Sequence, residues 1–208
     1  MKAIYIPAYS KSKVNSSKIS EISKNLPENI AIAYSIQYKK IAEEIKQILS
    51  SKHKITKTIQ VLGCTIPVLP KEIQAVLLIG SGEFHAVSLA LETGLPIYIL
   101  DNNNFKRISE KDIASIKLRQ KSSYLKFLNA DNIGILVSTK PGQQNFKKAQ
   151  IFKNSLKNKN FYIFIGDNIN SKEFENFAQI QSWLNTACPR LDFDSSVMNI
   201  NRINNFKD

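Results

Sequence analysis

Short apolar runs alternate with helical patterns along most of the chain. Runs of strand length occupy residues 30–34, 58–62, 75–79, 97–100, 133–137 and 161–165. Helices are predicted between them, at residues 38–49, 84–91 and 145–157. Nearly continuous apolar strands that alternate with helices are typical of parallel sheets covered on both faces. We therefore predict an α/β fold with two related three-layer α/β/α domains, each built on a small parallel sheet.

A longer helix is predicted at residues 109–129, where it would join the two domains. Ser109 and Asp112 have the spacing of a capping box, with Asp in place of Glu, so Ser109 is expected to cap this helix. Its inner face is expected to consist of Ile113, Ile116, Tyr124 and Leu128.

The two ends of the chain are expected to pack less well. Residues 3–7 have the pattern of a short, isolated N-terminal strand, and a lone strand needs a sheet to complete. Residues 10–29 are rich in Ser, Lys and Asn, so we expect a solvated connection that contains one helical turn. The polar, Asn-rich tail from Asp194 is expected to be loosely held.

The composition narrows the class of protein. With 208 residues, 43% hydrophobic content and two cysteines, the chain is neither a disulfide scaffold nor a disordered acidic tail. Its formal net charge of +12 comes mainly from lysine, since only four of the 29 basic residues are arginine. Arginine is the residue that usually binds phosphate and guanine, through two hydrogen bonds from its guanidinium group. Because the chain has few arginines, we expect no specific nucleic-acid partner. No apolar run reaches the roughly 18 residues of a membrane span and no signal peptide is seen, so we expect a cytoplasmic protein with no membrane partner.

Three loops directly follow predicted strands, and ligands of open α/β sheets bind beyond the carboxyl ends of the strands. The first loop carries Cys64 one residue after a glycine. The second consists of Gly80, Ser81 and Gly82, whose backbone can approach an anion closely. The third has groups that suit a carboxylate or phosphate, on Ser138, Thr139, Lys140, Gly142 and Gln143.

Each of these loops also has a simpler interpretation. Cys64 can be a small buried residue, the glycine loop an ordinary tight turn, and the third loop a capped helix start stiffened by Pro141. Neither a dinucleotide-binding fingerprint nor a Walker loop is present. The cysteines and histidines are isolated from one another, which argues against a zinc site. A nucleophilic enzyme that uses Cys64 and His85 stays open, although no orienting third group can be named.

A fourth segment, residues 185–190, carries Cys188 in the sequence Thr-Ala-Cys-Pro-Arg. Proline stiffens the backbone after the thiol, and Arg190 can hold an anion nearby. Because the cytosol keeps thiols reduced, the two distant cysteines are not expected to form a disulfide. Metal ligation or redox chemistry is the role left to them.

Taken together, four motifs resemble the diphthamide synthesis family. They are Gln-Val-Leu-Gly-Cys at 60–64, Leu-Ile-Gly-Ser-Gly-Glu-Phe-His at 78–85, Gly-Ile-Leu-Val-Ser-Thr-Lys-Pro-Gly-Gln at 134–143 and Asn-Thr-Ala-Cys-Pro-Arg at 185–190. Their order and spacing are similar to those of the archaeal 2-(3-amino-3-carboxypropyl)histidine synthases.

The resemblance implies an enzyme of the first step of diphthamide biosynthesis. Such a transferase moves the 3-amino-3-carboxypropyl group of S-adenosylmethionine to a histidine of translation elongation factor 2 by a non-classical radical mechanism. It depends on a [4Fe-4S] cluster held by three cysteines, one from each of three related α/β domains.

By position in the motifs, Cys64 and Cys188 match the cluster ligands of the second and third domains. The loop residues named above match family loops that we expect to hold the carboxylate and amine of S-adenosylmethionine. Arg190 joins them, because its guanidinium fork can bind both oxygens of a carboxylate.

The chain departs from the family pattern in its number of domains. We expect residues 1–29 to be the remnant strand and linker of a missing first domain, residues 30–105 the second-type domain, and residues 106–208 the third-type domain with its polar tail. The first-domain cysteine is then absent from this sequence.

Three interpretations of this departure stay open. The chain can be one part of a split enzyme in which another chain supplies the first domain and third cysteine, and we favour this interpretation. It can also be a non-catalytic accessory subunit that supports a complete synthase or a homologous subunit. Finally, it can be a binding module for elongation factor 2 or RNA that has lost the cluster.

Overall fold

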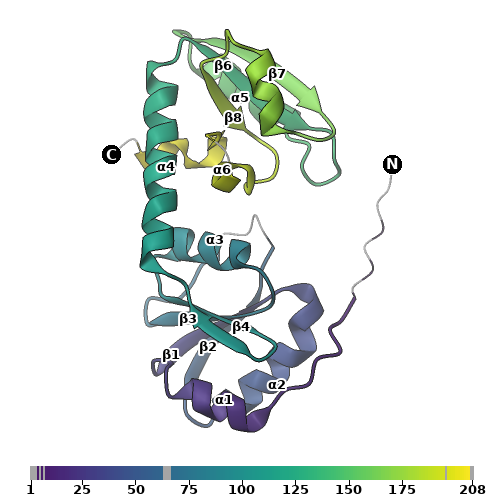
Figure 1. The fold of residues 1–208 in the computed structure, drawn as a ribbon, viewed down its shortest axis with the longest axis vertical. Helices are drawn as coiled ribbons and strands as arrows, with labels where there is room; N and C mark the ends of the chain where they lie inside the picture. The colour runs from purple at the N-terminus through teal and green to yellow at the C-terminus, as the bar shows by residue number, and fades with distance from the viewer. Residues whose placement is uncertain (1–3, 5, 7, 63–66, 195, 207–208) are drawn as a thin grey trace. The chain divides into compact units, whose positions relative to one another are not determined.

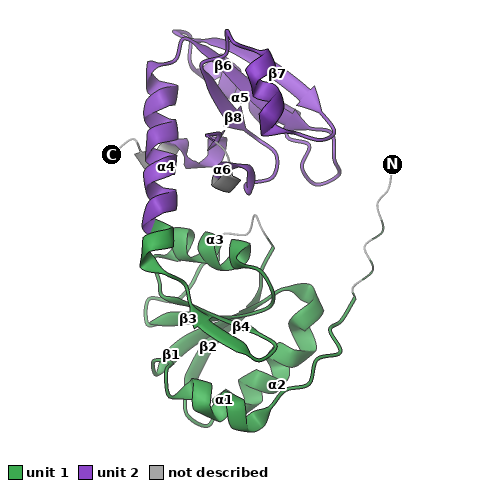
Figure 2. Cartoon of the chain, viewed as in Figure 1, with its two compact units in different colours: residues 1–113 green, residues 114–208 purple. Residues whose placement is uncertain are grey.

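The chain folds into two compact units. A computed structural model describes residues 4, 6, 8–62, 67–194 and 196–206. Unit 1 is Met1–Ile113 and unit 2 is Ala114–Asp208, so that the boundary lies within α4 (Glu110–Asn129) (Figure 2). Each unit contains one small, largely parallel sheet, which confirms the predicted α/β class.

Unit 1 is built on a five-stranded sheet in the order β2-β1-β3-β4-β5 (Figure 1). The strands are β1 (Asn29–Tyr34), β2 (Lys54–Gln60), β3 (Ala75–Ile79), β4 (Ile97–Asp101) and β5 (Asn104–Arg107). Neighbouring strands are parallel except for β4 and β5, which form an antiparallel hairpin. All five residues of β3 are buried, as its continuous apolar sequence predicts for a central strand.

Helices cover both faces of this sheet. Figure 1 shows α1 (Ser16–Ser23) and α2 (Lys39–Leu49) on one face and α3 (Glu83–Thr93) on the other; the short η1 (Ile36–Tyr38) leads into α2. The core on the α1–α2 face joins side chains of both helices to alternate residues of the strands. Its members include Ile19, Ile22, Ile30, Ile32, Ala42, Ile45, Leu49, Leu77 and Ile79.

Residues 10–29 are not the solvated connection that we expected. Asn15 begins α1, because its side-chain oxygen accepts a hydrogen bond from the Lys18 N–H at 3.2 Å. Ile19 and Ile22 are each 4% exposed and belong to the same core as α2. The prediction was wrong because the segment is mostly polar in composition, yet Ile19 and Ile22 lie at helical spacing and form one apolar face.

The predicted N-terminal strand is not seen among the described residues of 3–7. Ile4 and Ile6 lie outside any strand and are 87% and 86% exposed. The predicted strand is therefore not present at the two residues of this segment that the structure describes.

Unit 2 is built on a four-stranded sheet in the order β7-β6-β8-β9, with every neighbouring pair parallel. The strands are β6 (Asn132–Ser138), β7 (Asn160–Gly166), β8 (Ser182–Asn185) and β9 (Met198–Asn199). The helical segments are α4, α5 (Phe146–Ser155), η2 (Ser171–Asn176), α6 (Leu191–Asp194) and η3 (Ile200–Phe206).

The two faces of the second sheet are covered differently. One face packs against α4, α5 and η3 in a core that includes Phe127, Ile133, Ile135, Ala149, Leu184 and Ile203. The other face carries Trp183, whose ring stacks on Phe174 at 4.4 Å between centroids and lies 4.7 Å from Phe164. Gly134 pairs with Trp183 across the strands, and a Cβ at this position would overlap two atoms of the indole ring.

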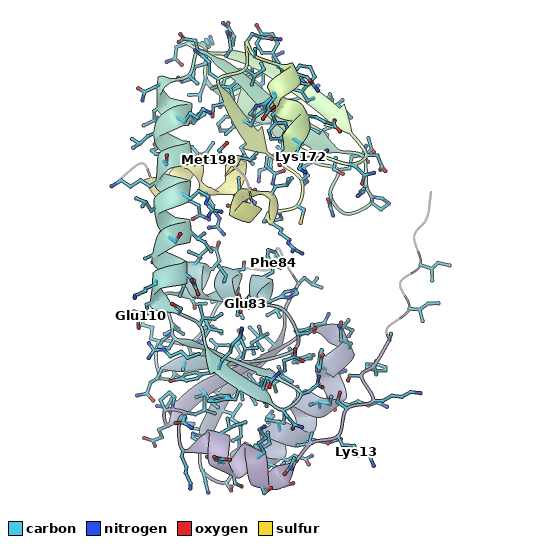
Figure 3. The ribbon with its side chains drawn as sticks, in the orientation of Figure 1. Lys13, Glu83, Phe84, Glu110, Lys172 and Met198 are labelled. Carbon is cyan, nitrogen blue, oxygen red and sulfur yellow. The ribbon has the colours of Figure 1, made fainter. Side chains whose placement is uncertain are left out.

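Two predictions about unit 2 need correction. The described part of the tail is not loosely held, since Met198 (Figure 3) is 3% exposed and pairs with Leu184 in the sheet. Ile203 belongs to the core of unit 2. On α4, Ser109 accepts a hydrogen bond from the Lys111 N–H as a cap, and the predicted inner residue Tyr124 is buried. Leu128 is 46% exposed, and its neighbour Phe127 is buried in its place.

Candidate functional site

The candidate residues lie in loops at the carboxyl ends of parallel strands. In unit 1, the Gly80–Gly82 loop connects β3 to α3. In unit 2, residues 138–143 connect β6 to α5, and residues 186–190 follow β8, which is the direct neighbour of β6. The topology therefore brings the last two loops to the same end of one sheet.

The loop of unit 1 exposes backbone at the start of α3. Gly82 is the residue before this helix, its φ is 91°, and the space that a Cβ would occupy is open. Gly80 is buried, and its N–H donates to the Leu100 carbonyl at 3.1 Å. Ser81 is exposed between them, while Glu83 begins α3 (Figure 3). The Glu83 carboxylate forms an ion pair with Lys106. The loop can thus present N–H groups to an anion, with a carboxylate close by.

In unit 2, the side chains at 138–140 are held by the end of β7. Ser138 is 2% exposed, and its hydroxyl donates to the Asp167 carbonyl at 3.3 Å and accepts from the Lys140 N–H at 3.2 Å. Thr139 donates through Oγ1 to the Asp167 carboxylate at 3.2 Å. The Lys140 ammonium donates to Asn168 Oδ1 at 2.5 Å. The polar groups that the sequence singled out therefore shape this loop through their own contacts.

The second half of this loop turns toward α5. The Gln143 N–H donates to the Lys140 carbonyl at 3.0 Å, and Gly142 allows the turn with a φ of 80°. Asn145 precedes α5 but does not cap it with its side chain. Its amide instead donates to the Thr186 carbonyl at 2.7 Å, so the two loops of unit 2 are joined directly.

Cys188 lies in a loop whose backbone is fixed from several directions. Thr186 donates through both N–H and Oγ1 to the Leu136 carbonyl of β6, at 3.1 and 2.8 Å. Asn185 accepts from the Ala187 N–H at 2.8 Å and donates to the Cys188 carbonyl at 2.8 Å. The cysteine is free of disulfide bonding and only partly buried. Its thiol is therefore carried by an ordered loop and lies near the protein surface.

Two asparagines in this network were missed by the sequence analysis as functional residues. Asn185 donates to Asn199 Oδ1 at 2.5 Å, and Asn199 donates to the Pro189 carbonyl at 2.8 Å. Both are buried, at 2% and 5% exposure. Asn185 is the first residue of the motif that carries Cys188, whereas Asn199 lies in the tail and gave no signal in the sequence.

The charged residues beyond Cys188 differ in burial. Arg190 is exposed. The buried carboxylate of Asp192 accepts from Gln120 at 3.2 Å and lies 3.5 Å from Arg202 Nε. This buried pair ties the start of α6 to α4 and η3 within unit 2, while Arg190 is exposed.

The described residues offer one thiol of the expected metal site. Cys64 lies outside the described residues, so its prediction as a ligand, and as a partner of His85, stays a prediction. Within the part of the chain that the structure describes, no group of three or more His, Cys, Asp or Glu side chains could hold a metal ion. Cys188, partly exposed on an ordered loop, can supply one thiolate to a metal site. The other ligands of such a site would come from residues outside this group.

None of the described helices is both long and apolar enough to cross a membrane.

Comparison with known proteins decides the family. The family of diphthamide synthesis proteins matches residues 1–198. The chain belongs to this family. The resemblance found in the four motifs is thereby confirmed.

Two curated relatives illustrate the similarity. The chain is 27% identical over 206 residues to the 2-(3-amino-3-carboxypropyl)histidine synthase of Pyrococcus horikoshii, covering 92% of this chain and 59% of the relative. It is 28% identical over 200 residues to subunit 1 of that synthase from Schizosaccharomyces pombe, covering 85% of this chain and 45% of the relative. The chain thus spans about half the length of these relatives.

Two solved structures share the fold. One is Dph2 from Pyrococcus horikoshii, with a TM-score of 0.78 and 24% identity, covering 92% of this chain and 61% of the other. The second is Dph2 from the same organism with a 4Fe-4S cluster, with a TM-score of 0.75 and 26% identity, covering 88% and 58%. An iron-sulfur cluster is thus present in a structural neighbour.

Proposed function

We propose that this chain takes part in the first step of diphthamide biosynthesis, as the transferase that moves a 3-amino-3-carboxypropyl group. The donor is S-adenosylmethionine and the acceptor is a histidine of translation elongation factor 2. The transfer breaks the bond between sulfur and the γ-carbon of the methionine portion, so that the thioether 5′-methylthioadenosine leaves, and it forms a bond to an imidazole carbon, which gives up its hydrogen as a proton. The overall reaction neither consumes nor releases electrons. The observation that carries this proposal is the ordered loop with Cys188, beside the 138–143 loop, in a chain of this family.

The chain's cysteines are proposed to hold a [4Fe-4S] cluster. Cys188 supplies one thiolate from the carboxyl end of β8, and Cys64 supplies a second. When bound, such a cluster offers one electron and an iron position open to a cosubstrate. The sequence contains two cysteines, so the third thiolate would come from outside these 208 residues.

The loops around Cys188 are proposed to bind the amino-acid part of S-adenosylmethionine. Arg190 is exposed two residues after the thiol and can hold the carboxylate through both oxygens. The turn at Gly142 and Gln143 offers backbone groups on the neighbouring loop. The Gly80–Gly82 loop of unit 1 is proposed by itself to bind an anionic group, because it lies at the start of α3.

The proposed partners follow from this reaction. Elongation factor 2 is the protein substrate, and a further chain or domain completes the cysteine set. The curated relative from Schizosaccharomyces pombe is named as a subunit, which supports an assembly of more than one chain. A cytoplasmic location is proposed because translation factors act there.

Iron and sulfide reconstitution of the chain under anaerobic conditions tests the cluster. Excess dithiothreitol is included so that a small thiol can occupy iron positions that the chain does not fill. We expect iron and sulfide to bind to the wild-type chain with thiolate-to-iron absorbance bands, and to be lost in Cys64→Ser and in Cys188→Ser. Ser122→Ala, an exposed change on α4, is the control and should bind as the wild type does. Iron that binds equally to both cysteine variants would contradict the proposal.

Binding of S-adenosylmethionine to the reconstituted chain tests the second part. Arg190→Gln is expected to weaken the affinity about tenfold, because it removes a charge-assisted hydrogen-bond donor. Arg107→Gln removes a charge of the same kind from β5 and should leave the affinity unchanged. Equal affinities for Arg190→Gln and wild type would remove Arg190 from the proposed site.

A further inference from the structure

Cys188 is flanked by backbone carbonyls that are held by two buried side-chain amides. Asn185 donates to the Cys188 carbonyl at 2.8 Å, and Asn199 donates to the Pro189 carbonyl at 2.8 Å. The two amides are themselves joined, because Asn185 donates to Asn199 Oδ1 at 2.5 Å. The two peptide groups that follow the Cys188 thiol are therefore tied to one buried pair, which we call the asparagine clamp.

The sheet explains why the clamp is rigid. Asn185 is the last residue of β8 and pairs in register with Asn199 of β9. Their exposures of 2% and 5% exclude water from most of the network. A buried amide that loses a partner leaves an unsatisfied polar group, so alternative arrangements of this loop are unfavourable.

The side-chain amides of Asn185 and Asn199 both donate and accept hydrogen bonds. Asn185 Oδ1 accepts from the Ala187 N–H at 2.8 Å while its amide group donates to two oxygens. Asn199 Oδ1 accepts from Asn185, and its amide group donates to Pro189. A carboxylate of the same shape can reproduce the accepted hydrogen bonds but not the donated ones.

We infer that Asn185 and Asn199 are positioning residues, which fix the direction of the Cys188 thiol in advance of metal binding. This inference rests on the proposed function, in which Cys188 is a cluster ligand. Metal sites depend on outer partners that orient their ligands, and the clamp does this through the backbone of the ligand. Asn145 supports the same loop from the side of α5, through its hydrogen bond to the Thr186 carbonyl.

The first test observes the apo chain and needs no metal. In a Cys64→Ser background Cys188 is the sole cysteine, so labelling with carbon-13 cysteine gives an NMR spectrum of this residue alone. We expect one sharp Cβ signal in the parent chain and a shifted or split signal in Asn199→Asp, which keeps the acceptor and removes the donor to Pro189.

A matched change at the other end of the sheet serves as the control. Asn160 donates to Asn132 Oδ1 at 3.0 Å, so Asn160→Asp introduces the same charge and removes an amide donor far along the strands from Cys188. Its cysteine signal should match that of the parent chain. An Asn199→Asp chain that folds, by circular dichroism, with an unchanged cysteine signal would overturn the inference. If that variant does not fold, Asn145→Asp, an exposed site, carries the same test with the same criteria.

The second test follows the loaded chain and separates this inference from the proposed function. After reconstitution, Asn199→Asp is expected to lose iron to a chelator about tenfold faster than Asn160→Asp, since one hydrogen bond to a buried carbonyl is lost. An altered cysteine signal together with iron binding that does not depend on Cys188 would contradict the proposed function and leave the clamp intact. Equal iron loss from both variants, in a chain that needs Cys188 for iron, would overturn the positioning role.

Discussion

The two sheets have similar buried apolar strands, but different elements pack against their faces. In unit 1, helices α2 and α3 bury three and four side chains respectively, so regular helices cover both faces. In unit 2, one face is covered by α4, by η3 and by α5, which buries Ala149 alone, and the opposite face is closed by Trp183 with phenylalanines around it. The second unit therefore depends on a few large side chains and on its tail, and it should be the more sensitive to single changes.

The largest effect is expected where Trp183 meets the backbone of β6. In Gly134→Ala the new methyl group would overlap two ring atoms and lie 3.2 Å from Ile180 Cγ2, so strands or ring must shift. Overpacking of this severity costs about 3 kcal/mol. Urea unfolding should show this loss of unfolding free energy.

Gly166→Ala is the matched control for this change. A Cβ there would approach no atom closer than 3.8 Å, so the free energy of unfolding should change by less than about 0.5 kcal/mol. Equal stabilities of the two alanine variants would show that Trp183 does not limit the packing of unit 2.

A smaller effect is expected for α1, the helix of unit 1 that the sequence analysis missed. Ile19→Ala removes a side chain that is 4% exposed in the core with α2, and should cost about 2 kcal/mol. Thermal unfolding should show the lower stability. Leu118→Ala, at a site 70% exposed, is the control and should be nearly neutral. A neutral Ile19→Ala would mean that unit 1 does not need α1 as part of its cover.

These cases show which parts of the fold the sequence can predict. The runs at β3 and β6 and the helical spacing of α2 are strong local patterns, and the structure has them within a few residues. The predictions for the α1 segment and the tail were wrong, because both segments are mostly polar in composition. Their few apolar residues are buried by contacts with distant parts of the chain, which the local sequence does not show. Phe127 in place of Leu128 is a difference of one position on α4, which spacing alone does not resolve.

The candidate site also has parts that the local sequence predicts and parts that depend on contacts in three dimensions. The loop with Ser138 could be found from the sequence, because it lies directly after an apolar run. The loop with Cys188 could be found from its motif, although β8 before it was not predicted. The role of Asn199 could not be found, because its contact with Asn185 depends on the register of β8 and β9 across 14 positions of sequence. Side-chain contacts set by strand register are invisible to local pattern.

The smallest expected effect concerns the thin cover that α5 gives to unit 2. Burial lowers the pKa of Lys148 below its usual 10.5, because desolvation disfavours the charged ammonium. The folded chain then binds fewer protons than the unfolded chain as the pH approaches 10.5, so its stability should rise with pH in that range. Lys148→Met should be slightly more stable than wild type at pH 7, and this advantage should disappear by about pH 11. Lys147→Met on the same helix is the control, and an identical pH profile for both variants in urea unfolding would show that α5 does not desolvate Lys148.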